Sequence, residues 1–235
     1  MLSSCGYGGG MVDALNANFY GNGTQTLHYL IPFLACYFKV LVFDLAFAPN
    51  LNLKKTIYVG HSMSAMIGCI AATKKPELFE HLVQLGGSPR YLNEEGYEGG
   101  FTRSELDTIF ESIKQNFSGW AHSFAPNAIS TNNPAAVAEF ERSLLRMIKP
   151  EVALSVAKTV FLSDLRWVLP LVRVPNSTII QPREDPIVPV NVAFCMKSKL
   201  GSRSKVTILE TQGHFRQLTA YRLLLQVLKD SLSLK

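Results

Sequence analysis

The chain has 235 residues, of which 47% are hydrophobic and 17% charged, and its formal net charge is +5. This length and balance are typical of a globular domain with a sizeable core, and they exclude a disordered chain or a fibre. The basic residues form isolated pairs, Lys54-Lys55 and Lys74-Lys75, rather than a stripe with interleaved aromatics. We therefore expect no nucleic-acid partner.

The cysteines are far apart in the sequence and form no C-x-x-C pair: Cys5, Cys36, Cys69 and Cys195. This spacing predicts neither a zinc site nor a disulfide framework. We therefore expect no metal, no cofactor and a reducing compartment, the cytoplasm and nucleus. The apolar segment Leu27–Ala48 is interrupted by Pro32, Lys39 and Asp44, which argues against a membrane span.

Short apolar runs rich in branched residues recur along the chain and predict strands that are covered on both faces. They are Val40–Asp44, Thr56–Gly60, Leu82–Gly86, Thr178–Gln181 and Val206–Glu210, with an earlier strand at Thr24–Leu30. Helical patterns follow several of them, at Ser64–Lys75, Val190–Leu200 and Thr219–Leu232. This alternation predicts an α/β fold with a mostly parallel sheet.

Residues 102–163 differ from the rest, because their apolar residues recur with helical spacing. Leu106, Phe110 and Phe117 would share one helical face, and Pro134 would stand in the first turn of another helix. We expect a single domain, 1–235, in which this segment forms an inserted helical lid. The natural place for it is the carboxyl edge of the sheet, where ligands of open α/β sheets bind.

The segment Thr56–Met66 carries the strongest chemical pattern in the chain. A branched strand runs into Gly60-His-Ser-Met-Ser64 and a helix follows at once, which is the context that a nucleophile elbow requires. The tight turn needs small residues two before and two after the nucleophile, and Gly60 and Ser64 supply them. Ser62 is therefore the candidate nucleophile. The backbone N–H of Met63, at the start of the helix, is a candidate oxyanion donor.

A serine hydroxyl needs a base, and the candidates are His28, His61, His81, His122 and His214. His61 lies in the elbow and would point away from the hydroxyl, His81 is expected at a helix end, and His122 lies in the lid. Only His214 follows a late strand through a glycine turn, as the chain order Ser, Asp, His demands in this kind of fold. The alternative for His214 is a solvated loop histidine.

Two carboxylates are candidates for the acid that orients the base. Glu184 and Asp185 both lie in a loop after a predicted strand. We prefer Asp185 because it precedes a Pro-x-x-Pro segment that fixes the turn, and we expect Glu184 to be a solvated neighbour. The spacing from Ser62 to Asp185 leaves room for the lid, and the spacing from Asp185 to His214 leaves room for one helix and one strand.

With these motifs in place, the chain from about Lys54 to Leu228 resembles the plant strigolactone and karrikin receptor-hydrolases. The resemblance rests on Tyr58-Val-Gly-His-Ser-Met-Ser-Ala-Met-Ile-Gly-Cys-Ile-Ala72, Pro76-Glu-Leu-Phe79, Gly87-Ser-Pro-Arg-Tyr-Leu92, Gly99-Gly-Phe101, Phe124-Ala-Pro126, Thr159-Val-Phe-x-Ser-Asp164 and Gly213-His214. Together these motifs are far more specific than the elbow alone.

The resemblance implies an α/β-hydrolase fold with a catalytic triad that falls on Ser62, His214 and Asp185. It also implies a four-helix lid over an aromatic pocket for a butenolide lactone, which the protein cleaves slowly. Pocket-side aromatics of that lid match Trp120, Phe124 and Phe161; the alternative is that each one packs inside the lid. The implied partners are a leucine-rich-repeat F-box protein and transcriptional repressors, and we expect a monomer.

The chain also departs from the family pattern in two places. Family members carry a His-Gly-aromatic-Gly loop that supplies the second oxyanion donor, but here the expected strand Thr24–Leu30 runs straight into Ile31-Pro32-Phe33. The stretch Gly6–Gly10 lies on the wrong side of that strand. In addition, residues 45–55 are too few and too irregular for a parallel crossover with its helix. We therefore predict a shortened core.

Three functions are compatible with this pattern. The first is a serine hydrolase and receptor for butenolides. The second is a ligand-binding or signalling protein of the same fold with little catalysis, because losing one oxyanion donor costs about 3 kcal/mol, a factor of about 10²–10³ in rate. The third is a generic carboxylesterase, since a fold alone does not fix a function.

Overall fold

The computed structural model describes residues 27–40, 54–130 and 132–234. Most of the predicted strand Val40–Asp44, the glycine stretch Gly6–Gly10 and most of the crossover at 45–55 lie outside the described residues. The predictions that concern those segments therefore stay predictions.

The described core is a four-stranded parallel sheet with the order β1-β2-β3-β4. Its strands are β1 (Thr56–His61), β2 (Phe79–Leu85), β3 (Asn176–Glu184) and β4 (Ser204–Gln212). Every residue of β1 is buried, as expected for a strand between covered faces. The four strands predicted within the described residues are confirmed. The parallel pairing brings their carboxyl ends to one edge of the sheet.

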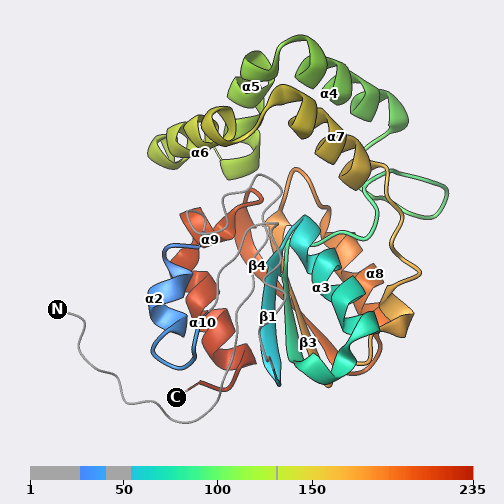
Figure 1. Cartoon of the computed structure of the whole chain (residues 1–235), viewed down its shortest axis with the longest axis vertical. Coiled ribbons are helices and arrows are strands. Elements are labelled where there is room, and N and C mark those ends of the chain that lie inside the picture. The colour runs from blue at the N-terminus through green and yellow to red at the C-terminus, as the bar shows by residue number, and fades with distance from the viewer. Residues whose placement is uncertain (1–26, 41–53, 131, 235) are drawn as a thin grey trace.

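Helices cover both faces of this sheet (Figure 1). On one face lie α3 (Met63–Lys74) and α8 (Val190–Leu200), and on the other lie α2 (Leu30–Leu34), α9 (Arg216–Thr219) and α10 (Tyr221–Ser231). Alternate strand residues belong to two separate hydrophobic clusters, with Leu82 in one and Val83 in the other. The sheet is thus the middle layer of three, which is the α/β architecture that the sequence predicts.

Two predictions about local structure are wrong, and a third is confirmed with a later start. Leu27–Tyr29 form a turn and a helix begins at Leu30, where we expected a strand; Leu27, Leu30 and Leu34 are buried together at helical spacing. His81 lies inside β2, not at a helix end, and its Nε2 lies 2.8 Å from Thr178 Oγ1. The helix predicted at Thr219–Leu232 is α10, which begins at Tyr221 because Ala220, with a φ of −136°, separates it from α9.

Between β2 and β3 the chain forms four helices that lie as a separate layer over the carboxyl edge of the sheet (Figure 1). They are α4 (Arg103–Gln115), α5 (Phe117–Ile129), α6 (Pro134–Met147) and α7 (Pro150–Phe161). Local sequence fixes where they begin: Thr102 and Glu105 form a reciprocal capping box, and the Asn116 and Asn133 side chains cap α5 and α6. These helices fill the segment for which we predicted a helical lid.

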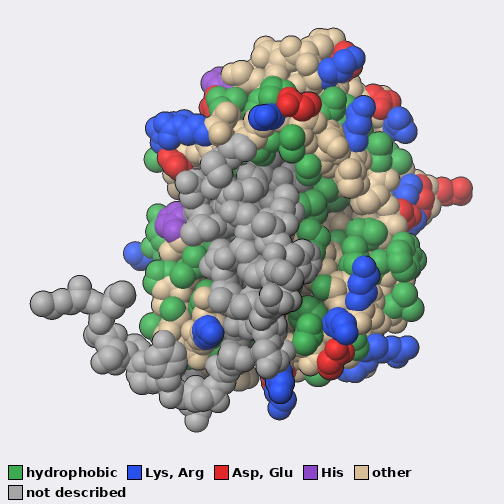
Figure 2. All heavy atoms as spheres, viewed as in Figure 1, with side chains coloured by type: hydrophobic (Ala, Val, Ile, Leu, Met, Phe, Trp, Pro, Cys, Tyr) green, Lys and Arg blue, Asp and Glu red, His purple; other side chains and the backbone are tan. Residues whose placement is uncertain are grey.

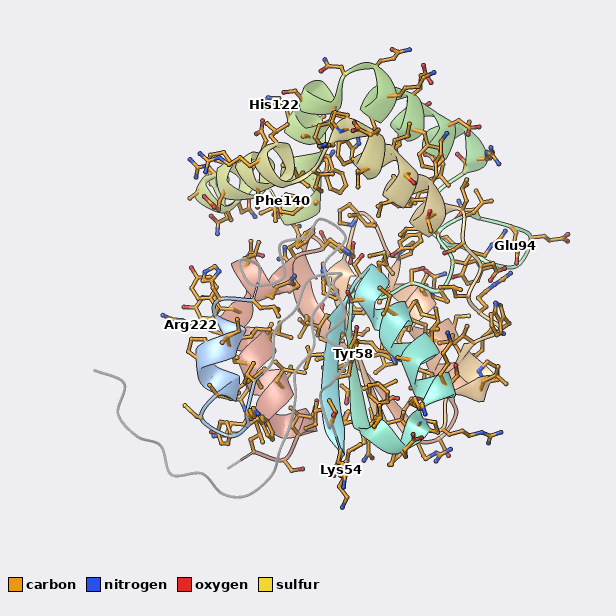
Figure 3. The ribbon with its side chains drawn as sticks, in the orientation of Figure 1. Lys54, Tyr58, Glu94, His122, Phe140 and Arg222 are labelled. Atoms are coloured by element: carbon orange, nitrogen blue, oxygen red, sulfur yellow. The ribbon has the colours of Figure 1, made fainter. Side chains whose placement is uncertain are left out.

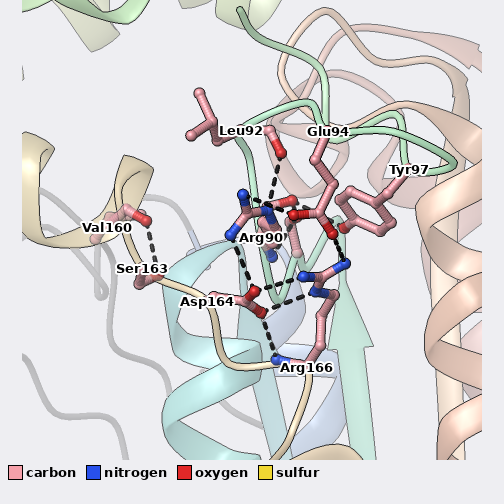
Figure 4. A network of polar contacts seen from close by, with 9 residues as sticks. Arg90, Leu92, Glu94, Tyr97, Val160, Ser163, Asp164 and Arg166 are labelled. Carbon is pink, nitrogen blue, oxygen red and sulfur yellow. Dashed lines mark hydrogen bonds and ion pairs between the residues drawn. The ribbon is translucent and has the colours of Figure 1, made fainter. Parts of the chain in front are cut away.

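An ion-pair network ties the two ends of this helical layer together (Figure 4). Asp164, just after α7, accepts from Arg90 at 2.9 Å and from Arg166 at 2.6 Å, and Glu94 also pairs with both arginines. The Arg166 guanidinium lies 4.8 Å from the centre of the Tyr97 ring. The segments that leave and re-enter the sheet are therefore held side by side.

The surface agrees with the charge pattern of the sequence. On the face shown in Figure 2, the Lys and Arg side chains are scattered between acidic and apolar ones and form no continuous basic patch. Within the described ranges, no helix combines the length and the apolar character needed to cross a membrane.

Candidate active site

Ser62 stands at the sharp corner between β1 and α3. Its backbone has φ 56° and ψ −122°, a conformation that a residue with a side chain rarely adopts, and its N–H donates to the Leu85 carbonyl at 2.8 Å. A Cβ on Gly60 would lie 2.7 Å from the Ser64 backbone, so only glycine fits two residues before the nucleophile. Tyr58, between β1 and α3 in Figure 3, donates its hydroxyl hydrogen to the Ser64 carbonyl at 3.0 Å. The sequence prediction of an elbow matches this geometry.

Met63 is the first residue of α3. The first N–H groups of a helix have no acceptor within the helix, and the helix dipole makes this end favourable for negative charge. The Met63 N–H is thus available as an oxyanion donor. Ile31-Pro32-Phe33, where the expected glycine loop with a second donor is missing from the sequence, lies in α2.

Asp185 and His214 follow β3 and β4 and form a buried pair. His214 Nδ1 lies 2.7 Å from Asp185 Oδ2, and the two side chains are 2% and 0% exposed. The other carboxylate oxygen accepts the backbone N–H groups of Ile187 at 2.9 Å and Val188 at 3.1 Å. Gln181 also donates to Asp185 Oδ2, at 3.3 Å. The carboxylate is therefore held from three sides, and it fixes the orientation of the imidazole ring.

The tautomer of His214 follows from this contact. A carboxylate only accepts, so Nδ1 donates, and in the neutral ring the lone pair is on Nε2. Nε2 is buried and has no hydrogen-bond partner among the described residues. A buried ring nitrogen that is ready to accept a proton is the feature that a general base needs.

Adjacent glycines bring the serine corner and this pair together. A Cβ on Gly86 would lie 3.2 Å from the His214 ring and 3.5 Å from Asp185 Oδ2, whereas one on Gly87 would meet Ala65 at 2.5 Å and the Ser62 carbonyl at 3.7 Å. The close approach of β2's end to both elements is possible because neither position carries a side chain. Ser62, Asp185 and His214 thus lie around one edge of the sheet.

Glu184, the alternative acid, lies away from the imidazole. It is exposed and accepts from Gln212 Nε2 at 2.6 Å.

Comparison with known proteins identifies the family. Strigolactone esterase D14 of Arabidopsis thaliana is 37% identical over 262 residues, which takes in 94% of this chain and 97% of that protein. Karrikin insensitive 2 receptor CA of Petunia hybrida is 36% identical, with 94% and 92% covered. The chain belongs to the family of strigolactone esterases and karrikin receptors. No family model matches it.

Solved structures confirm the predicted α/β-hydrolase fold. A hydrolase from Oleispira antarctica superimposes with a TM-score of 0.89 at 24% identity, over 97% of this chain and 93% of that one. An enol-lactonase from Burkholderia xenovorans LB400 gives 0.76 at 13% identity, over 96% and 92%.

Within this family the chain is short. The region aligned with the Arabidopsis esterase spans 262 positions, so that protein has at least 27 residues (262 − 235) with no counterpart here. The alignment does not locate these residues in the fold, and the shortened core stays a prediction.

The aromatic residues predicted for the family's pocket lie in two groups. Trp120 stacks on Phe124 with 4.8 Å between ring centres. The Phe124 ring contacts Phe140, and Phe140 contacts Phe215, which lies next to His214. Phe140 lies on the side of the helical layer that faces the sheet (Figure 3). Phe161 belongs to a second group. Both groups connect the helical layer to the catalytic edge, so packing and ligand contact remain compatible roles.

Phe161 packs edge-on against Tyr91, with 5.0 Å between ring centres. Tyr91 is a residue whose role sequence reasoning missed. It is only 2% exposed, and burial raises the pKa of its hydroxyl to about 12, while the nearby Ser62 hydroxyl opposes that rise. Its only signal in the sequence is its place in the motif Gly87–Leu92, because a lone tyrosine indicates no role by itself.

His61 is a second residue that sequence reasoning left without a role. Its Nε2 lies 3.1 Å from the His214 carbonyl, so this nitrogen must donate. Burial, with a smaller contribution from His214, holds the pKa of His61 well below its usual range. His61 is therefore a neutral donor that holds the backbone of His214.

Among the described residues, no group of three His, Cys, Asp or Glu side chains could hold a metal ion. Among the described residues, Cys69 and Cys195 are free thiols, and burial raises the pKa of Cys69 to about 12.

Proposed function

We propose that the chain is a serine hydrolase that binds butenolide-type lactones and cleaves them slowly. Ser62 is the nucleophile, His214 the base and Asp185 the group that orients the base. The observation that carries the proposal is the buried contact of 2.7 Å between His214 Nδ1 and Asp185 Oδ2. It leaves His214 Nε2 without a partner at the carboxyl edge of the sheet, where Ser62 forms the corner between β1 and α3. Family membership supports the ligand class, since its named members are strigolactone esterases and karrikin receptors.

In this mechanism the Ser62 oxygen attacks the ester carbon of the lactone, and its proton passes to His214 Nε2. The carbonyl oxygen becomes an anion that accepts the Met63 N–H, where the dipole of α3 stabilises it. As the ester C–O bond breaks, His214 returns the proton to the leaving oxygen. A water molecule then hydrolyses the acyl-serine with the same base. Asp185 stays ionised and stabilises the imidazolium.

The test is turnover of a fluorogenic butenolide by the wild-type chain and by Ser62→Ala. We expect slow release of the fluorophore, and its complete loss in the variant. Ser198→Ala, in an exposed part of α8, is the matched control and keeps full turnover. Equal turnover in wild type and Ser62→Ala would refute the proposal.

The same assay separates the two other functions. A protein that binds without catalysis would show no turnover but a lactone-dependent rise in Tm that persists in Ser62→Ala. A generic carboxylesterase would cleave p-nitrophenyl esters rapidly and ignore butenolides.

We also propose the partners and the setting that the family resemblance implies. They are a leucine-rich-repeat F-box protein and transcriptional repressors, bound by a monomeric receptor in the cytoplasm and nucleus. Co-precipitation that depends on the lactone and is lost in Ser62→Ala would support this, and light scattering would give the mass in solution. Binding of neither partner at saturating lactone would contradict it.

A further inference from the structure

A small, partly open hollow lies beneath the catalytic edge, between the sheet and the helices α9 and α10. Its volume is about 10 Å³, and most of its wall is apolar, with side chains such as Leu209 and Leu224. The polar residues that line it are His214, Arg216 and Gln217. A space of this volume holds a single particle of about the size of a water molecule.

Arg216 and Gln217 both contribute unpartnered N–H donors. Arg216 is 7% exposed and Gln217 is 1% exposed. Arg216 Nη2 donates to the Ile129 carbonyl at 2.8 Å, but Nε has no partner, and neither has Gln217 Nε2. Buried N–H groups are almost always bonded in native proteins, so two such donors lining one hollow indicate an acceptor between them.

The charge of Arg216 is also unbalanced. No carboxylate among the described residues forms an ion pair with it, and nearby Asp185 already accepts hydrogen bonds on both oxygens. Burial lowers the pKa of Arg216 to about 10, which still leaves the guanidinium charged at neutral pH. A buried cation without a counter-ion is costly, and a buried anion would offset that cost.

We propose that this hollow binds a single monovalent anion of halide size, held by the N–H groups of Arg216 Nε and Gln217 Nε2. The volume excludes phosphate, sulfate and organic carboxylates. The charge of Arg216 and the two unpartnered N–H groups favour an anion over a cation. The lining includes His214 but neither Ser62 nor Met63, so the anion would lie apart from the lactone's ester carbon.

The first test measures Tm at constant ionic strength while sodium bromide replaces sodium gluconate, whose anion is too large for the hollow. We expect a saturable rise, of about 3–6 °C at ten times the dissociation constant. Arg216→Gln should abolish the rise. Arg142→Gln removes the same charge from an exposed ion pair on α6 and should keep it. A change in Tm that is equal in all three proteins, or one that does not saturate, would overturn the proposal.

The second test uses crystals and first requires only the wild-type chain. Crystals of the wild-type chain soaked in bromide should show an anomalous peak between Arg216 and Gln217. Gln217→Leu, which removes one donor, should weaken that peak. An empty or water-filled hollow, with bromide at the surface only, would overturn the proposal.

Discussion

At the scale of single residues, the site depends on a few side chains and glycines whose roles can be separated. Ser62 is held at φ 56° by the flanking strand and helix, and Asp185 is held by backbone N–H groups. Backbone strain of this kind costs of order 1–3 kcal/mol and persists only where the surrounding structure fixes it.

Replacing Asp185 by Asn should separate orientation from packing. The Asn oxygen can still accept from Ile187 and Val188, but its NH₂ group would face His214 Nδ1 and force the proton onto Nε2. We expect butenolide turnover to fall by a factor on the order of 10⁴ with the fold retained. Glu184→Gln is the matched control, and its kcat should stay within about twofold of wild type. If both variants lost turnover equally, the assignment of Asp185 as the orienting acid would be wrong.

His61 should make stability depend on pH. Its pKa is lowered in the folded chain, so the unfolded state takes up the proton first as the pH falls below 6.5. The stability is therefore full above pH 6.5 and decreases below it, with a slope of up to about 1.4 kcal/mol per pH unit. His81, whose pKa is lowered to about 4, contributes in the same direction.

Urea unfolding between pH 7.5 and 5 measures this dependence. His61→Gln should flatten the slope, because Gln can donate to the His214 carbonyl but does not titrate. An unaltered slope in His61→Gln would show that His61 is not a buried neutral group.

At the scale of elements, the helical layer is attached to the site at two places. The end of α5 accepts the His214 N–H on the Ala128 carbonyl at 2.7 Å, and the network around Asp164 closes the other end (Figure 4). Arg166, mainly by hydrogen bonding, lowers the pKa of Asp164 to about 2. The carboxylate therefore stays ionised, and its contribution is lost only as the pH falls from about 4 towards 2.

Asp164→Asn should loosen the second attachment without unfolding the chain. We expect amide hydrogen exchange at residues 163–168 to become several-fold faster, because Arg90 and Arg166 lose one of their two shared carboxylates and keep only Glu94. Asp107→Asn breaks an exposed pair with Arg103 on α4 and should leave that segment unchanged. Unchanged exchange at 163–168 in Asp164→Asn would contradict the role of the network.

At the scale of the whole molecule, the sequence predicted those elements whose pattern is local. The strands around Thr56, Leu82 and Thr178 were predictable because a strand covered on both faces is a continuous apolar run. The edge strand around Val206 is less buried and was predictable from its branched residues. The short helix at Leu30–Leu34 was not predictable from its own residues, which have branched and aromatic neighbours. It is stabilised by packing against α10. A five-residue helix has too little periodicity to identify.

Some residues of the candidate site were also predictable from local sequence, and others were not. Ser62 could be named from its elbow, and His214 and Asp185 from chain order. Tyr91 and Arg216 could not, because their importance comes from burial beside residues distant in the sequence, and a tyrosine or arginine is usually a packing or surface residue.

The most direct test of the central claim is labelling with a fluorophosphonate, followed by peptide mapping. The account predicts one label per chain, on Ser62, with a rate that falls by at least about 10³ in His214→Gln and Asp185→Asn, although the serine is still present. A label on another residue, or the same labelling rate in all three proteins, would contradict the account.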